Sequence, residues 1–166
     1  MDRLLKWIEP PIHILMWMGV LAGLLMMLHV TADASGRTFF NHPLPGTTEI
    51  VSAYYMVAAA YLPWAWVARN DGHIQVNLFT RFAPPAFNAW LDIVVKCATV
   101  AYLALFTWQT FVRAMQQTRA GEVWQAGSGF VEIWQSRWLL PLAGAMMLLY
   151  LVLRVGADLA GQIRRR

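Results

Sequence analysis

The chain has 166 residues, of which 58% are apolar and only 13% are charged, with a formal net charge of +4. A water-soluble domain carries about 25% charged residues, so this composition excludes such a domain and indicates an integral membrane protein. The basic residues gather at the ends of apolar segments, where lipid headgroups and membrane orientation explain them better than nucleic acid does.

Four apolar segments are each long enough to cross a bilayer, whose hydrocarbon core takes about 20 helical residues. They cover residues 11–31, 47–68, 86–112 and 138–159, and together they form one membrane domain that takes up residues 1–166. The sequence therefore predicts an all-α integral membrane protein with four transmembrane helices.

The first two spans are joined by a short polar segment. The triplet at residues 32–34 could pass for a signal-peptidase site, but the apolar run before it is too long for the core of a signal peptide, so we expect no cleavage. Pro45 and Gly46 form a turn before the second span, a threonine caps the helix, and Glu49 lies at its positive end. Pro63, inside the second span, predicts a kink.

The second and third spans are joined by the stretch "RNDGHIQVNLFTRFAPP", residues 69–85. Asp71 and Gly72 turn the chain, and Asn77 can cap a short helix that must stop before Pro84. Such a helix would bury its apolar residues at the membrane interface and leave the polar ones in water. This loop therefore predicts a short interfacial helix.

The segment at residues 116–131, before the fourth span, is open between a helix and a loop, although "QAGSG" indicates at least a break. The distribution of basic residues predicts the orientation of the spans, because cytoplasmic segments carry the excess of lysine and arginine. Both chain termini and residues 69–85 should then be cytoplasmic, while residues 32–46 and 113–137 face outward.

Few polar groups lie inside the spans. Asp92 and Lys96 stand four residues apart on one face of the third span and predict an intramembrane ion pair. No phosphate-binding loop, nucleophile elbow or metal motif such as HExxH occurs, and the single cysteine, Cys97, excludes a cysteine metal cluster. Small residues at positions 22–23, 58–60 and 143–144 allow helices to approach closely. The sequence predicts helix packing, not an enzyme, and requires no cofactor or metal.

Two alternatives remain open at this point. A haem-binding membrane anchor of a respiratory complex would pair His13 with His73, or His29 with His42, although neither pair lies at mid-span on separate helices. A small homo-oligomeric exporter would need a membrane-embedded carboxylate, and Asp92 is the candidate for it.

Two motifs resemble those of one family. "GRTFFNHPLPGTTEI" at residues 36–50 is followed by a span and then by "RNDGHIQVNLF" at residues 69–79. Their order and spacing, with the arrangement of four spans, resemble the small membrane subunit (DctQ-like, Q subunit) of tripartite ATP-independent periplasmic (TRAP) transporters. The chain departs from the pattern at Gln75 and Asn77, where arginine and aspartate often stand.

The resemblance implies a non-enzymatic subunit of a sodium-coupled secondary transporter in the bacterial inner membrane. A periplasmic binding protein would deliver an organic anion, such as a dicarboxylate, a sugar acid or a sialic acid, to a large elevator subunit. The small subunit would brace the scaffold of the large one and help the binding protein dock. Its partners would be these two proteins and membrane lipids, with no nucleic acid, and none of its residues would bind substrate or sodium.

The resemblance also implies which residues matter. Residues expected to form the outer turn, at the start of the second span, are Asn41, Pro43, Pro45, Gly46 and Glu49. Residues expected to form the inner turn and interfacial helix are Arg69, Gly72, His73 and Asn77. Residues expected to contact the binding protein, from their predicted side and charge, are Arg37, Arg113 and Arg119.

Overall fold

The computed structural model describes residues 2–70, 85–126 and 129–164. In chain order the elements are α1 (Asp2–Phe40), α2 (Thr47–Ile50), the π-helical turn η1 (Val51–Tyr55), α3 (Met56–Tyr61), α4 (Trp64–Arg69), α5 (Pro85–Ala120), the strands β1 (Val123–Ala126) and β2 (Gly129–Glu132), the 3₁₀ turn η3 (Trp134–Trp138) and α6 (Leu139–Arg164). The predicted interfacial helix lies in residues 71–84, outside the described residues.

Four helical segments of the described chain are long and apolar enough to cross a membrane, namely Trp7–Phe40, Thr47–Arg69, Ile93–Ala120 and Trp134–Gly156. This confirms the prediction of an all-α membrane protein. The helices extend beyond the predicted spans, most clearly at α1, which continues to Phe40. Where the bilayer begins and ends along each helix stays a prediction.

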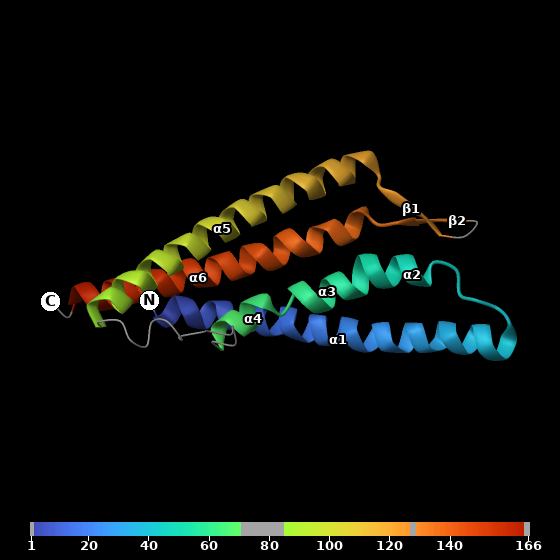
Figure 1. The fold of residues 1–166 in the computed structure, drawn as a ribbon, viewed down its shortest axis with the longest axis horizontal. Helices are drawn as coiled ribbons and strands as arrows, with labels where there is room; N and C mark the ends of the chain where they lie inside the picture. Colours follow the sequence, from blue (N-terminus) through green and yellow to red (C-terminus); the bar gives the residue numbers. More distant parts are fainter. Residues whose placement is uncertain (1, 71–84, 127–128, 165–166) are drawn as a thin grey trace.

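The helices lie side by side along the long axis of the molecule (Figure 1). Helix α6 packs against α5 on one side and against α3 and α4 on the other, and α1 covers α3 and α4. Both chain ends lie at one end of the molecule, and the β1–β2 hairpin lies at the opposite end, which we call the outer end, in keeping with the predicted orientation. The first and last helices can therefore begin and finish on the same side of a membrane.

Two buried clusters hold the helices together. One consists of Ile12, Ala65, Ala68, Leu103, Met147 and Tyr150. The other consists of Leu15, Ala22, Ala58, Leu62 and Ala143. Alanine recurs in both because helices inside a bilayer gain stability from close backbone approach and dense packing, which small side chains permit. The predicted small-residue positions 22, 58 and 143 thus lie at helix contacts.

The second span is interrupted at Pro63, as the sequence predicts, because a proline ring removes one backbone donor and clashes with the preceding turn. The Leu62 N–H still reaches the carbonyl of Ala58 at 3.1 Å, and the Val67 N–H reaches that of Pro63 at 3.0 Å. The ring of Pro63 lies over Gly19 of α1, where a Cβ would stand only 2.8 Å from Cγ. The absence of a side chain at Gly19 therefore makes room for the proline ring at the kink.

Strands β1 and β2 form an antiparallel hairpin that pairs Val123 with Glu132 and Ala126 with Gly129. This resolves the segment that the sequence left open: residues 116–120 continue α5, and the hairpin follows after Gly121, whose φ is +62°. Residues 127–128 lie outside the described part of the chain.

The contact between Gly19 and Pro63 predicts different effects of two similar substitutions. Gly19→Ala should destabilise the chain by about 1–3 kcal/mol, because the added methyl group overlaps a rigid ring. Gly23→Ala, one turn along the same helix, should be nearly neutral, since its Cβ would meet only the Cβ of Ala59 at 4.0 Å. Thermal unfolding of both variants in detergent measures the difference, and an equal loss in both would contradict it.

Candidate functional site

The outer turn, residues 41–46, begins where α1 ends. Asn41 takes a left-handed backbone conformation with φ of 51°, which asparagine adopts more readily than most residues and which stops the helix. The His42 N–H then donates to the carbonyl of Gly36 at 3.1 Å. A Cβ on Gly36 would lie 2.8 Å from the oxygen of His42, so a larger residue there would displace the turn.

A buried carboxylate holds this turn in place. One oxygen of Asp33 accepts the Leu44 N–H at 2.8 Å, and the other accepts the Arg37 guanidinium at 2.8 Å. The Thr47 hydroxyl, also buried, donates to the carbonyl of Leu44 at 3.1 Å. Asp33 and Thr47 thus bond the same residue from its two sides and fix where the second span begins. Asp33 was considered in the sequence only as part of a cleavage triplet.

The outer turn also contacts the hairpin. Gly46 has φ of 77°, and its carbonyl accepts the Ile50 N–H at 2.9 Å as α2 begins. A Cβ on Gly46 would stand 3.1 Å from Cγ2 of Val131 and 3.5 Å from Cβ of Ala126. Both the backbone conformation and this close approach therefore favour glycine at position 46.

The hairpin is fastened to the helices by polar side chains. The Tyr54 hydroxyl donates to the carbonyl of Glu132 at 2.7 Å, 78 residues away along the chain. Glu122, just before β1, forms a two-bond ion pair with Arg137 at 2.7 and 2.9 Å. Trp138 Nε1 donates to the Thr118 hydroxyl at 3.0 Å. These contacts join the outer ends of the second, third and fourth spans.

A second polar cluster lies at the end of the molecule that holds the chain termini. Arg69 pairs with Glu9 at 2.8 Å, and its other nitrogen lies 3.4 Å from Nε2 of His13. Arg154 approaches the carbonyl of Ala68 at 3.4 Å. Arg69, predicted as part of the inner turn, therefore ties α4 to α1 in the structure.

The remaining predicted residues differ in their surroundings. Pro43 and Pro45 are exposed in the outer turn, and Glu49 is half-buried in the first turn of α2. Arg37 is bound to Asp33, whereas Arg119 is exposed in the last turn of α5. Gly72, His73 and Asn77 lie outside the described residues, as does the side chain of Asp92, so its ion pair with Lys96 stays a prediction.

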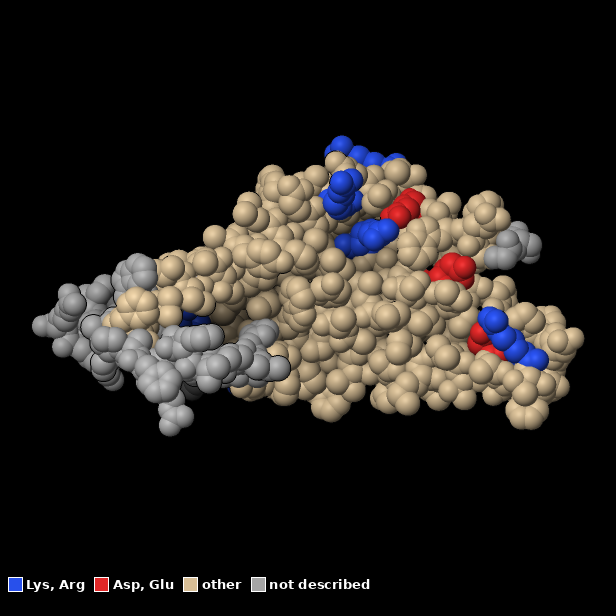
Figure 2. Space-filling view, viewed as in Figure 1, with Lys and Arg blue, Asp and Glu red and all other residues tan. Residues whose placement is uncertain are grey.

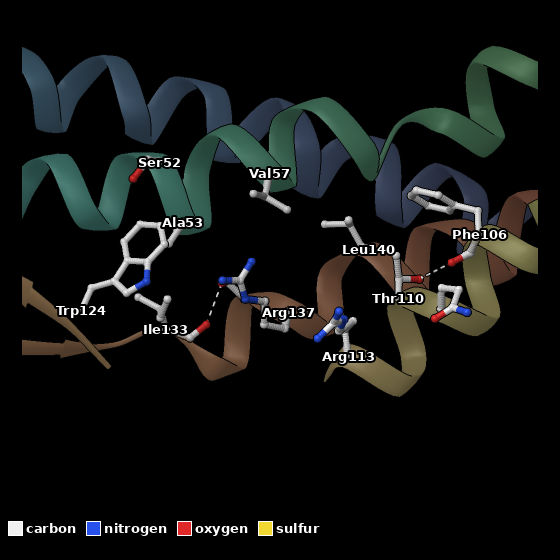
Figure 3. Close-up of a pocket in the computed structure, with 12 residues that line it drawn as sticks. Ser52, Ala53, Val57, Phe106, Thr110, Arg113, Trp124, Ile133, Arg137 and Leu140 are labelled. Atoms are coloured by element: carbon white, nitrogen blue, oxygen red, sulfur yellow. Dashed lines mark hydrogen bonds between the residues drawn. The ribbon is translucent and has the colours of Figure 1, made fainter. Parts of the chain in front are cut away.

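A pocket of about 450 Å³ opens at the outer end between the second span and α5 (Figure 3). Its apolar walls include Val57, Phe106 and Leu140, and Arg113 and Arg137 project toward it. A smaller pocket of about 280 Å³ at the other end is lined by Glu9, Arg69 and Arg154. Figure 2 shows the visible acidic side chains and most of the visible basic ones over the upper middle of the molecule and the half that carries the hairpin.

Metal chemistry finds no support in the described part of the chain, where no three His, Cys, Asp or Glu side chains are grouped to hold an ion. Three of the four histidines named for a haem are described by the structure. His13 Nδ1 lies 2.9 Å from the carbonyl of Glu9, and the His29 ring packs edge-on against Tyr55 with centroids 5.8 Å apart. His42 is exposed in the outer turn, and His73 is outside the described residues.

Removing the Asp33 carboxylate should loosen the outer turn. Asp33→Ala leaves the Leu44 N–H without its acceptor and Arg37 without its acid, and should weaken the attachment of the turn to α1. Hydrogen exchange of residues 44–50, measured by mass spectrometry, should accelerate. Glu49→Gln, a neutralised acid in the same region whose carboxylate makes no hydrogen bond to another described residue, serves as the control. Unchanged exchange in Asp33→Ala would show that the turn is held by other contacts.

The ion pair of Glu122 predicts a pH dependence. The hydrogen bond from Arg137 holds the pKa of Glu122 below its ordinary value of 4.5. Since the pKa is lowered on folding, the stabilisation is present above that ordinary value and is lost as the pH falls through the lowered pKa. The difference in melting temperature between the parent chain and Glu122→Gln should therefore shrink at acidic pH. An unchanged difference at acidic pH would show that this ion pair does not stabilise the folded chain.

The family comparison agrees with the sequence motifs. The chain matches the family model described as "Tripartite ATP-independent periplasmic transporters, DctQ component" over residues 26–161. No curated protein matches the chain. The matched region includes the outer turn, the hairpin and most of the four helical spans. The chain belongs to the DctQ family, the DctQ component of tripartite ATP-independent periplasmic transporters.

Proposed function

We propose that this chain is the non-catalytic small permease subunit of a sodium-coupled TRAP transporter in the bacterial inner membrane. The family match over residues 26–161 carries this proposal. The transported substrate would be an organic anion, such as a dicarboxylate, a sugar acid or a sialic acid. Substrate and sodium would bind the large subunit, and this chain would brace the scaffold of that subunit and help the periplasmic binding protein dock.

The packing of the spans supports a bracing role. In the most apolar stretch of each span no more than 28% of the residues are buried within the described chain, and in the third span the share is 6%. Large apolar side chains are exposed along α1 and α5, among them Trp17, Leu24, Tyr102 and Leu105. Such surfaces can be covered by lipid or by helices of a partner, and close helix packing in membranes favours the latter where small residues allow it.

The rigid outer end supports a role in docking. The outer turn with Asn41, Pro43, Pro45, Gly46 and Glu49 is fixed by Asp33 and rests on the hairpin. Arg37 and Arg119 present charge at this end, and Arg113 lines the pocket beneath it. At the opposite end, Arg69 with Gly72, His73 and Asn77 would form the inner turn and support the scaffold contact. A preformed surface binds with less loss of conformational freedom than a mobile one.

Family membership favours this reading over the two alternatives. A haem-binding membrane anchor would copurify with soluble redox subunits and show a Soret band. A small exporter would confer drug resistance when expressed alone, with Asp92 as its membrane carboxylate.

The test is affinity purification of the tagged chain from native membranes in mild detergent, with mass spectrometry of the copurified proteins and a visible spectrum of the same sample. We expect a large multi-span membrane protein at near-equal amounts and no Soret band. Recovery of redox subunits with haem would contradict the proposal. Transport of a radiolabelled organic anion by the complex, with and without sodium, then examines the coupling.

Docking makes a separate prediction about charge. Arg119→Glu should weaken association of the binding protein with the complex by about fivefold at low salt, with less effect at high salt, because exposed charges act chiefly through screened attraction. Lys6→Glu, at the other end of the molecule, is the matched reversal. Surface plasmon resonance with the complex in nanodiscs measures both. Equal affinity of the two variants at low salt would remove Arg119 from the docking surface.

A further inference from the structure

Arg113 lines the outer-end pocket, and the sequence of α5 indicates how deep in the membrane this arginine lies. On α5, Lys96 and Arg113 flank residues 97–112, which contain no charged side chain. This helical stretch is about 24 Å long, close to the roughly 30 Å of a bilayer's hydrocarbon core. With the predicted third span, which ends at residue 112, and the predicted orientation, Arg113 is expected near the outer boundary of the hydrocarbon, at the level of the lipid phosphates.

Arg113 is not neutralised within the described chain. Its neighbour in the pocket, Arg137, is held by both oxygens of Glu122 at 2.7 and 2.9 Å. No hydrogen bond or ion pair to another described residue holds the Arg113 guanidinium. Arginine stays protonated in proteins, and a charge at the edge of the hydrocarbon is costly unless an anion or water meets it. Of the two arginines that line the pocket, Arg137 is therefore paired with Glu122, and Arg113 is paired with no acid among the described residues.

The rest of the pocket is mostly apolar. Figure 3 shows Val57 of α3 and Leu140 of α6 near the middle of the pocket, with Phe106 toward one end and Ile133 and Trp124 toward the other. The volume of about 450 Å³ lies in the range of sites that take small molecules. A cation beside an apolar hollow suits an amphiphile with an anionic head and a hydrocarbon tail.

We propose that this pocket binds a phospholipid of the outer leaflet, with its phosphate on the guanidinium of Arg113 and an acyl chain along Val57, Phe106 and Leu140. The bilayer supplies a phosphate at this depth, and guanidinium groups bind phosphate through paired hydrogen bonds. The chain fits the apolar walls, which a free anion would leave in contact with water. A bound lipid would also fill the space between the second span and α5.

The experiment titrates phosphatidylglycerol into the detergent-purified full chain, with its copurified partner where one is present, and counts bound lipid by native mass spectrometry. Arg113→Gln should weaken binding by about tenfold or more, the effect of losing hydrogen bonds to a charged group. Arg113→Lys, which keeps the charge, should retain most of the affinity. Arg119→Gln, the same change six residues along α5, should bind as the parent chain does.

Two further measurements test whether the apolar walls of the pocket contribute to binding and whether the bound phosphate belongs to a lipid or to a free anion. Leu140→Trp, which fills the apolar hollow and leaves Arg113 in place, should reduce lipid binding. Glycerol phosphate, the head without the chains, should neither bind with comparable affinity nor displace the lipid. Equal binding of glycerol phosphate would assign the site to a free anion and overturn the proposal.

Two other results would also overturn it. Equal phosphatidylglycerol binding by the parent chain and Arg113→Gln would show that the retained lipid lies elsewhere. Unchanged lipid binding together with reduced recovery of the large subunit in Arg113→Gln would indicate that a partner carboxylate neutralises the arginine. Because the lipid count needs only the purified chain, it holds whether or not the transporter partner is recovered.

Discussion

The hydrogen bond from the Leu44 N–H to the buried carboxylate of Asp33 determines how the outer end is built. The two residues are 11 positions apart, and the bond closes the chain back onto the last turns of α1. Once Leu44 is fixed, Gly46 falls where α2 can begin and where a Cβ would stand only 3.1 Å from Cγ2 of Val131 in the hairpin. Arg37 neutralises the same carboxylate, so burial of its charge costs less than it would for an unpaired acid.

Two groups of arginines among the described residues differ in which side chains bind them. Arg37, Arg69 and Arg137 each pair with an acid of the same chain, which makes them part of the fold. Arg113 and Arg119 have no such acid among the described residues. Both side chains are exposed, but Arg113 also lines a mostly apolar pocket, whereas Arg119 is not among the residues that line it. This difference is the reason that Arg113, and not Arg119, is proposed to bind a ligand.

The sequence was sufficient to predict the spanning helices, because the length of an apolar segment indicates whether it can cross a membrane. It also predicted the kink, because a proline inside a helix interrupts its hydrogen bonds. It did not predict the hairpin or the role of Asp33. Tyr54 meets Glu132 across 78 residues, and Glu122 meets Arg137 across 15, and no local pattern marks such partners. Two signals were available for Asp33. An arginine stands four residues on, and Leu44 lies between two prolines in an irregular turn, where its backbone N–H needs an acceptor outside a helix.

The two ends of the molecule are tied differently, and this bears on how a subunit of this family could serve a moving partner. At the outer end, backbone and side-chain bonds join the outer turn, the hairpin and three helical spans into one body. At the other end, the pair between Glu9 and Arg69 and the contact of Arg154 with Ala68 join α1, α4 and α6. Between them the helices meet through alanines, which allow close approach, and through larger buried side chains such as Ile12, Leu62 and Leu103. The proposed bracing role calls for a scaffold that stays fixed, and the bonds at the two ends of the molecule are the contacts that such a role would use.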